Sequence, residues 1–245
     1  MAESTKLVFE QAEYRPLPDY LLGRPAERLV RRAIVEYYRE RGWNLSLCGM
    51  CVWLAAHTFD RFYSRRLGGP QAVSHSELAR AAGACLVLAA ETTIRGSIVK
   101  EVADDIGSIV PGCTVKSIMD SRITVLNTLG NFKYTTSPCG VARTLVFRFA
   151  RQDAASALPL VEEVTYSLCT DYDFIGYPHN DIAIAVVYAV LHRSSSRRTA
   201  VEMWDSVARQ CDEACLKTVW RRARELLIFH PNQRMLTCAA VGFSL

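Results

Sequence analysis

Apolar residues recur three and four positions apart along most of the chain, and no stretch alternates apolar and polar residues for long enough to form a strand. This spacing places apolar side chains on one face of a helix and predicts an all-α fold. The stretch WLAAHTFDRFYSRR, residues 53–66, begins as an apolar helix and then carries Asp60 and Arg61 among aromatic residues. Because a charge on an apolar helix needs a partner, Asp60 requires one from elsewhere in the chain.

Five helices are predicted before residue 134, with breaks at Gly and Pro residues between them. Pro25 precedes the first helix, where the missing proline N–H costs little. Ser74 and Glu77 have the spacing of a capping box, and Thr114 is a predicted N-cap. The predicted helices span about 26–41, 47–64, 74–91, 97–109 and 114–129.

The same order of elements returns after residue 137, where Ser137 and Pro138 begin another helix. HSELARAAGACLVL from His75 and HNDIAIAVVYAVLH from His179 share the order of cap, acidic residue and apolar core. The period is too long for a solenoid, so we predict two duplicated five-helix domains, each around a buried third helix. The second set is predicted at about 137–150, 154–168, 179–191, 199–209 and 212–229.

The composition is that of a globular chain and limits the partners and the cellular compartment that fit it. The 245 residues are 50% hydrophobic, which suffices for the cores of two domains. A net charge of +4 is too small to favour a nucleic-acid-binding face. Nine cysteines, mostly among apolar residues, are typical of free core thiols in a reducing compartment. The N-terminus lacks the pattern of a signal peptide, and apolar runs of about ten residues are too short to span a bilayer.

No arrangement of residues indicates catalysis. His57 and Asp60 have the i, i+3 spacing of metal ligands, but a zinc site needs more ligands and the single CxxC pair has no second pair to join it. His179 and Asp181 are interpreted as residues that cap the helix they open. Nucleophile-elbow, P-loop and dinucleotide-binding motifs are absent from the sequence. We therefore expect a binding protein, with neither enzymatic activity nor a cofactor or metal.

Four segments resemble the cyclin box in order and spacing: VRRAIVEYY, WLAAHTFDRFYSRR, SELARAAGACLVLAAETTI and IMDSRITVLNTLGNFKY. The similarity covers about residues 28–134, and the second half follows the family's architecture more than its letters. The resemblance implies a regulatory subunit that binds and activates a cyclin-dependent protein kinase. It also implies a lead-in at 1–24, a first cyclin box at 25–134, a second box at 135–230 and a tail at 231–245.

The resemblance supplies a partner for Asp60. In cyclins the Arg of the Met-Arg-Ala-Ile-Leu helix pairs with the Asp of Asp-Arg-Phe, and the ungapped match places Arg31 opposite Asp60. We therefore predict a buried Arg31–Asp60 ion pair that joins the first two helices.

The resemblance also implies a kinase-binding face on the third and fifth helices. The family has a Lys and a Glu there, whereas this chain has Glu91 and Arg122, with the signs reversed. We expect these two side chains to face each other and apolar contacts to contribute more of the interface. The family's Phe-Glu-Glu-Ile is shortened to Thr-Thr-Ile, a departure that bears on kinase choice. The implied kinase-binding residues are Leu88, Glu91, Thr92, Ile94, Arg122 and Leu126.

A second implied site is the groove in which many cyclins hold Arg-x-Leu motifs of substrates and inhibitors. Glu40 keeps an acid for the motif's Arg, but smaller side chains replace the family's Met, Ile and Trp and remove apolar contact area. We therefore predict weak binding of such motifs. The matching positions are Val30, Ala33, Ile34, Tyr37, Glu40 and Leu78.

The compact chain and the reversed pair resemble the D-type-like cyclins encoded by gammaherpesviruses. This resemblance implies constitutive, poorly inhibited kinase activation in a host nucleus and also in the cytoplasm. It implies no membrane partner, and we do not expect nucleic acid to be a partner. Two other uses of the same fold remain alternatives: a transcription-factor-B-like nucleic-acid-binding module and a peptide-binding scaffold of the retinoblastoma-pocket kind. A helical metal hydrolase that uses His57 and Asp60 is a third alternative.

Overall fold

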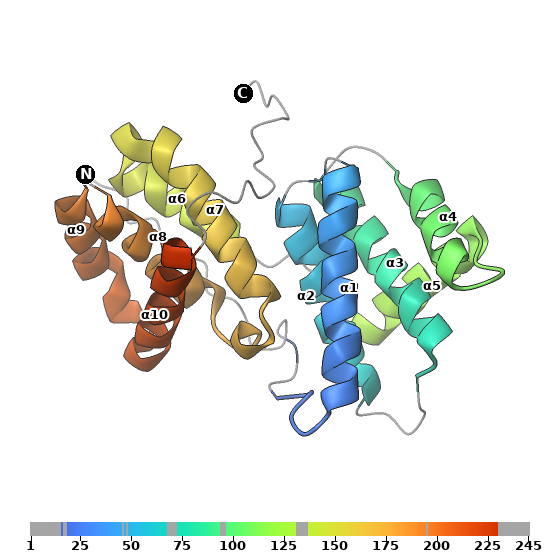
Figure 1. The fold of residues 1–245 in the computed structure, drawn as a ribbon. Coiled ribbons are helices and arrows are strands. Elements are labelled where there is room, and N and C mark those ends of the chain that lie inside the picture. Colours follow the sequence, from blue (N-terminus) through green and yellow to red (C-terminus); the bar gives the residue numbers. More distant parts are fainter. Residues whose placement is uncertain are drawn as a thin grey trace. The chain divides into compact units, whose positions relative to one another are not determined.

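The described part of the chain is all-α, as the apolar spacing predicts, and contains no strand (Figure 1). The structure, a computed structural model, describes residues 16, 19–45, 47, 49–67, 73–93, 97–130, 137–194 and 196–229. The chain divides into two compact units, which we call the N-terminal unit (α1 to α5) and the C-terminal unit (α6 to α10).

The N-terminal unit contains five helices close to the predicted positions. They are α1 (Pro25–Asn44), α2 (Gly49–Leu67), α3 (His75–Thr93), α4 (Val99–Ile109) and α5 (Val115–Leu129). The C-terminal unit contains α6 (Pro138–Phe149), α7 (Ala154–Thr170), α8 (His179–Arg193), α9 (Arg197–Val207) and α10 (Glu213–Phe229). Three 3-10 turns, η2 (Arg151–Asp153), η3 (Tyr172–Phe174) and η4 (Ala208–Gln210), join helices of this unit.

Local capping signals set several of these boundaries. Thr114 and Ser117 form a capping box at the start of α5, with Ser117 N–H donating to Thr114 Oγ1 at 3.2 Å and Thr114 N–H donating to Ser117 Oγ at 2.8 Å. Ser137 caps α6 and Pro138 occupies its first turn, as predicted. Both signals are short-range, so the sequence alone was enough to place them.

Two predicted caps differ in the structure. The Ser74–Glu77 box is half formed, because Glu77 N–H donates to Ser74 Oγ while the Glu77 carboxylate accepts from Arg66 at 2.8 Å instead. At α8 the N-cap is Pro178, which makes no side-chain cap, and His179 and Asp181 lie buried in the first turn. The interpretation of His179 and Asp181 as caps was therefore wrong, because burial of the helix start overrides the local cap pattern.

In the N-terminal unit α3 packs against α1, α2, α4 and α5 and lies in the interior (Figure 1). Its residues from Ala81 to Ala90 are all buried. Gly83 permits the close approach of α4 and α5, since a Cβ there would lie 2.9 Å from Val102 Cγ1 and 3.1 Å from Ile118 Cδ1. The small residues of α3 therefore let the other helices of this unit surround it.

In the C-terminal unit α8 has the corresponding interior position and packs against α6, α7, α9 and α10. Its residues from Ile182 to Val187 are buried among apolar side chains of the other four helices. A helix that is apolar on almost every side is stable only when it is covered in this way.

Candidate functional site

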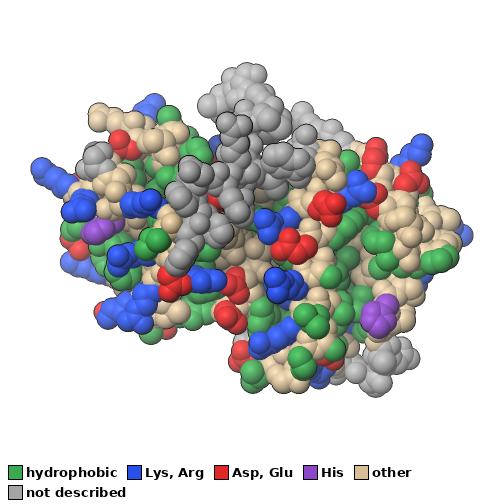
Figure 2. Space-filling view, in the orientation of Figure 1, with side chains coloured by type: hydrophobic (Ala, Val, Ile, Leu, Met, Phe, Trp, Pro, Cys, Tyr) green, Lys and Arg blue, Asp and Glu red, His purple; other side chains and the backbone are tan. Residues whose placement is uncertain are grey.

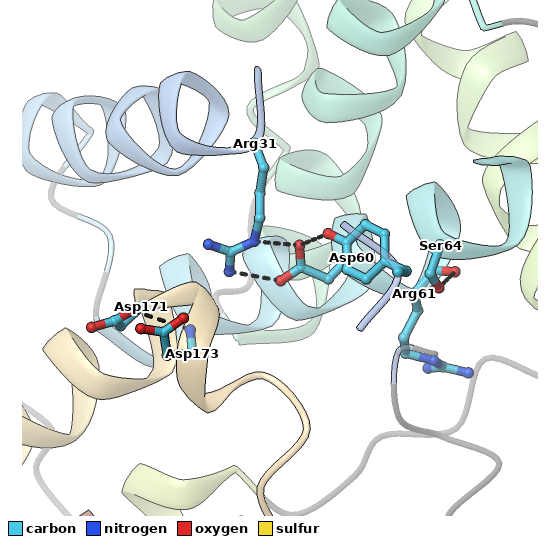
Figure 3. Close-up of polar contacts among 7 residues, drawn as sticks. Arg31, Asp60, Arg61, Ser64, Asp171 and Asp173 are labelled. Carbon is cyan, nitrogen blue, oxygen red and sulfur yellow. Dashed lines mark hydrogen bonds and ion pairs between the residues drawn. The ribbon is translucent and has the colours of Figure 1, made fainter. Parts of the chain in front are cut away.

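A buried ion pair joins α1 to α2. Arg31 Nε donates to Asp60 Oδ1 at 2.8 Å, and Arg31 Nη2 donates to Asp60 Oδ2 at 2.9 Å (Figure 3). Each side chain is only 4% exposed. The predicted pair is thus present, in the bidentate geometry that gives the strongest guanidinium–carboxylate contact.

The network around Asp60 also includes a residue that the sequence did not indicate. Tyr20, in the turn before α1, donates its hydroxyl to Asp60 Oδ1 at 2.7 Å, and its ring lies edge-on to Tyr63 at 6.0 Å. Burial alone would lower the pKa of Arg31, but the charge and hydrogen bonds of Asp60 outweigh it and raise that pKa above its usual range. The Arg31 guanidinium is therefore charged at every physiological pH, and the pair fixes α1, α2 and the preceding turn together.

The second predicted pair lies at the surface. Arg122 Nη2, from α5, donates to Glu91 Oε2, in the last turn of α3, at 2.8 Å. The two side chains are 29% and 32% exposed, so they bridge internally and still present charge to solvent. The expectation that they face each other agrees with this geometry.

An apolar stripe on α5 adjoins this pair. Val115 and Ile123 are exposed, Ile123 to 56%, and Met119 and Leu126 are partly exposed. These four positions lie within one third of the helix circumference at 100° per residue. The sequence analysis selected only Leu126 from them, although the spacing of 115, 119, 123 and 126 would have indicated the whole stripe.

The other implied kinase-binding residues have different positions. Leu88 is buried in the core at 4% exposure and does not belong to the exposed face, which corrects the expectation that it offers an apolar contact. Thr92 is partly exposed, and its hydroxyl donates to the Leu88 carbonyl at 2.7 Å within the last turn of α3. Ile94 lies outside the described residues.

The implied docking groove is partly present on α1. Val30, Ile34 and Tyr37 are partly exposed at helical spacing, and Ala33 and Glu40 are exposed. The remaining position, Leu78, is buried within the unit, so it cannot line an open groove without moving.

Tyr37 has an unusual environment on this face of α1. Its hydroxyl is buried and has no hydrogen-bond partner among the described residues, and burial raises the pKa of Tyr37 to about 12. Because Tyr37 is partly exposed, this face of α1 offers part of a tyrosine ring at the position where the resemblance implies a larger tryptophan.

The alternative metal site at His57 and Asp60 is not supported by their surroundings. His57 is buried and stacks on Trp53 with ring centroids 5.1 Å apart, and the Asp60 carboxylate is engaged by Arg31. No group of three or more His, Cys, Asp or Glu side chains that could hold a metal occurs among the described residues. Burial raises the pKa of Cys51 to about 11, so its thiol stays protonated at neutral pH.

None of the helices in the described ranges is long and apolar enough to cross a membrane. Comparison of the sequence with models of known protein families gives no match, and comparison with curated protein sequences gives none either. The residues and their geometry therefore carry the functional argument.

Proposed function

We propose that this chain is a cyclin-type regulatory subunit that binds and activates a cyclin-dependent protein kinase. The observation that carries the proposal is the buried pair of Arg31 with Asp60, at 2.8 and 2.9 Å. The cyclin resemblance places these residues opposite each other, and Asp60 lies buried among the apolar residues of α2, where a carboxylate needs a partner. No catalytic group is required, because such a subunit acts by binding.

The arrangement of helices supports the same reading. Within the described residues each unit has five helices, and its third helix, α3 in one and α8 in the other, is buried and in contact with the remaining four. We propose that the two units are tandem cyclin boxes, at 25–134 and 135–230. Their sequence similarity is weak, so the proposal rests on the order and burial of the helices.

The proposed kinase-binding face consists of the C-terminal end of α3 and the exposed face of α5. It includes the Glu91–Arg122 pair, Thr92 and the α5 stripe. A subunit activates a kinase when it binds the active conformer more tightly and shifts the population toward it. Apolar contact on the stripe supplies affinity, whereas the reversed pair offers acceptors from Glu91 and donors from Arg122 and so selects the kinase.

The α1 groove is proposed as a weak docking site. Glu40 is exposed and retains an acid for an Arg-x-Leu motif, but the buried position of Leu78 and the small side chain of Ala33 reduce the apolar surface. A subunit of this kind would be poorly captured by docking-motif inhibitors. This property, with the reversed signs of Glu91 and Arg122, supports the proposal of a viral cyclin of gammaherpesvirus type that drives the host cell cycle in the nucleus.

The test mixes the purified chain with a panel of monomeric cyclin-dependent kinases and measures co-elution and phosphorylation of a histone substrate. We expect one or more kinases to co-elute and become active. The double variant Glu91→Lys/Arg122→Glu keeps an ion pair but restores the family's signs, and we expect it to change the order of preference among the kinases.

A matched control is available on the same unit. Arg66 and Glu77 also pair at 2.8 Å, with side chains 31% and 32% exposed, between α2 and α3. The variant Arg66→Glu/Glu77→Lys should leave kinase preference unchanged. If no kinase binds the folded chain, the proposal fails; if both double variants alter binding equally, the assignment of the face fails.

A further inference from the structure

The C-terminal unit carries an aromatic surface that plays no part in the proposed kinase-binding face. We call Tyr188, His192, Trp204 and Trp220 the α8 aromatic cluster. The ring of Tyr188 lies 4.6 Å from Trp204, 5.5 Å from His192 and 6.4 Å from Trp220, measured between centroids. Helices α8, α9 and α10 contribute one or two side chains each, so the tertiary fold rather than any local motif brings them together.

All four side chains of the cluster are partly exposed. Beneath them the core is already closed by fully buried residues of the same helices, among them Val187, Met203 and Val219. The aromatic rings therefore form a second layer that water reaches. Tryptophan and tyrosine in such positions are enriched where proteins bind partners, because they bury much area for little lost side-chain entropy.

The margin of the cluster is basic. The Arg224 guanidinium lies over the Trp220 ring at 4.9 Å, and Arg197 Nε donates to the His192 carbonyl at 3.3 Å. Neither of these two arginines forms an ion pair with any described residue, whereas Lys217 and Arg222 of α10 are paired with glutamates. Figure 2 shows Lys and Arg side chains gathered over the visible face of α9 and α10. Two arginines that contact the cluster thus have no ion-pair partner in the part of the chain that the structure describes.

We propose that the α8 aromatic cluster binds an acidic peptide segment of a partner protein, which lays one aromatic or large aliphatic side chain against the rings. The segment's carboxylates would pair with Arg197 and Arg224, and its apolar residue would cover the rings. Charge complementarity selects this occupant, because the two charged side chains that contact the cluster, Arg197 and Arg224, are both positive.

Other occupants match the charges less well. Residues 230–245 of this chain contain a single charged side chain, Arg234, and so supply no carboxylate side chain for the margin. Nucleic acid is favoured by a large excess of positive charge, but residues 137–229 contain equal numbers of basic and acidic residues. The proposal is independent of kinase binding, since it concerns a different unit and a different surface.

The test uses the full chain and fluorescein-labelled peptides, with binding followed by fluorescence anisotropy. The first peptide is Gly-Asp-Glu-Asp-Phe-Asp-Glu-Asp-Gly; a second has Ala in place of Phe, and a third has Lys in place of every acid. We expect the first to bind at least tenfold more tightly than either of the others. Equal binding of the first and third peptides, or no binding of the first, would overturn the proposal.

Charge variants locate the site without disturbing the rings. Arg197→Glu/Arg224→Glu should weaken binding of the first peptide at least tenfold and make it less sensitive to salt. Arg148→Glu/Arg151→Glu is the matched control, because these exposed arginines of the same unit also lack ion pairs among the described residues and lie on α6 and η2. Equal loss in both variants would mean nonspecific attraction and would contradict the site.

A ¹⁵N-labelled sample reports the contact directly through its four tryptophan indole N–H signals. The first peptide should shift the signals of Trp204 and Trp220 and leave that of Trp53, in the N-terminal unit, unchanged. Shifts confined to the N-terminal unit would overturn the proposal. So would concentration-dependent dimerisation abolished by Arg197→Glu/Arg224→Glu, or a labelled twelve-residue oligothymidine that displaces the peptide, since each identifies a different occupant.

Discussion

Removal of the Asp60 carboxylate is the most direct test of how the N-terminal unit is held together. In Asp60→Ala the Arg31 guanidinium keeps its charge in a site where its side chain is 4% exposed, and it loses acceptors at 2.8 and 2.9 Å. Stranding one partner of a buried pair costs about 3–5 kcal/mol. The lost acceptor of the Tyr20 hydroxyl adds about 1 kcal/mol. Together these effects predict a loss of about 4–6 kcal/mol in the free energy of unfolding, comparable to the whole stability of many domains.

Because Asp60→Ala can leave this unit unfolded, the test also needs a second variant, Arg31→Met/Asp60→Leu. It replaces both charges with apolar groups, a change that often leaves stability unaltered or raises it. We expect it to retain most of the stability that Asp60→Ala loses. Urea unfolding followed by circular dichroism measures the loss, and hydrogen exchange of peptides from α1 and α2 assigns it to the N-terminal unit. A loss below about 1 kcal/mol in Asp60→Ala would refute the reasoning, since only solvent-exposed pairs cost so little.

Three further predictions follow from the packing and the surface pair. Gly83→Ala should destabilise the N-terminal unit by about 1–3 kcal/mol in urea unfolding, because its new Cβ would lie 2.9 Å from Val102 Cγ1; an unchanged midpoint would contradict the close packing. A double-mutant cycle of Glu91→Ala and Arg122→Ala should give a coupling free energy of only about 0.2–1 kcal/mol, since both side chains are about one-third exposed; a larger value would mean that the pair is structural. Burial raises the pKa of Cys211 to about 12, and the hydrogen bond to a neighbouring carboxyl adds to this increase. Mass spectrometry should therefore find that this thiol reacts slowly with iodoacetamide at pH 8 until the chain is unfolded. Rapid labelling of the folded chain would contradict that environment.

The positions of the helices could be predicted because the signals are local. The cap of α5 at Thr114 and the start of α6 at Ser137 and Pro138 depend on residues within a few positions of each other. Where tertiary contacts compete with a local capping pattern, the prediction made from that local pattern was wrong. Glu77 pairs with Arg66 across two helices in place of its own helix start, and the first turn of α8 is buried.

The surface of the molecule was harder to infer than its core. Leu88 and Leu78 belong to apolar helix faces, and periodicity does not distinguish a side chain beneath a surface from one at it. The ion pair of Arg31 with Asp60 was predicted from a resemblance and not from the residues alone, because the partners are 29 positions apart and no local pattern links them. Tyr20 carries no local signal, since its hydroxyl contacts Asp60 forty positions away. In the α8 aromatic cluster only Tyr188 and His192 are four positions apart on one helix, and Trp204 and Trp220 join them through the tertiary fold.

Two ion pairs of the N-terminal unit, Arg31–Asp60 and Glu91–Arg122, have nearly the same length but opposite consequences. Arg31 and Asp60 are sequestered, so their mutual attraction is strong and their loss would be felt throughout the unit. Glu91 and Arg122 share their contact with water, so reversing or removing them changes what a partner meets while the helices stay in place. Selection on a partner can therefore act on the second pair without endangering the fold, whereas any change to the first pair must alter both residues together. Under the cyclin assignment that we propose, the reversed signs of the exposed pair change what the kinase meets, whereas the buried pair keeps α1 and α2 together.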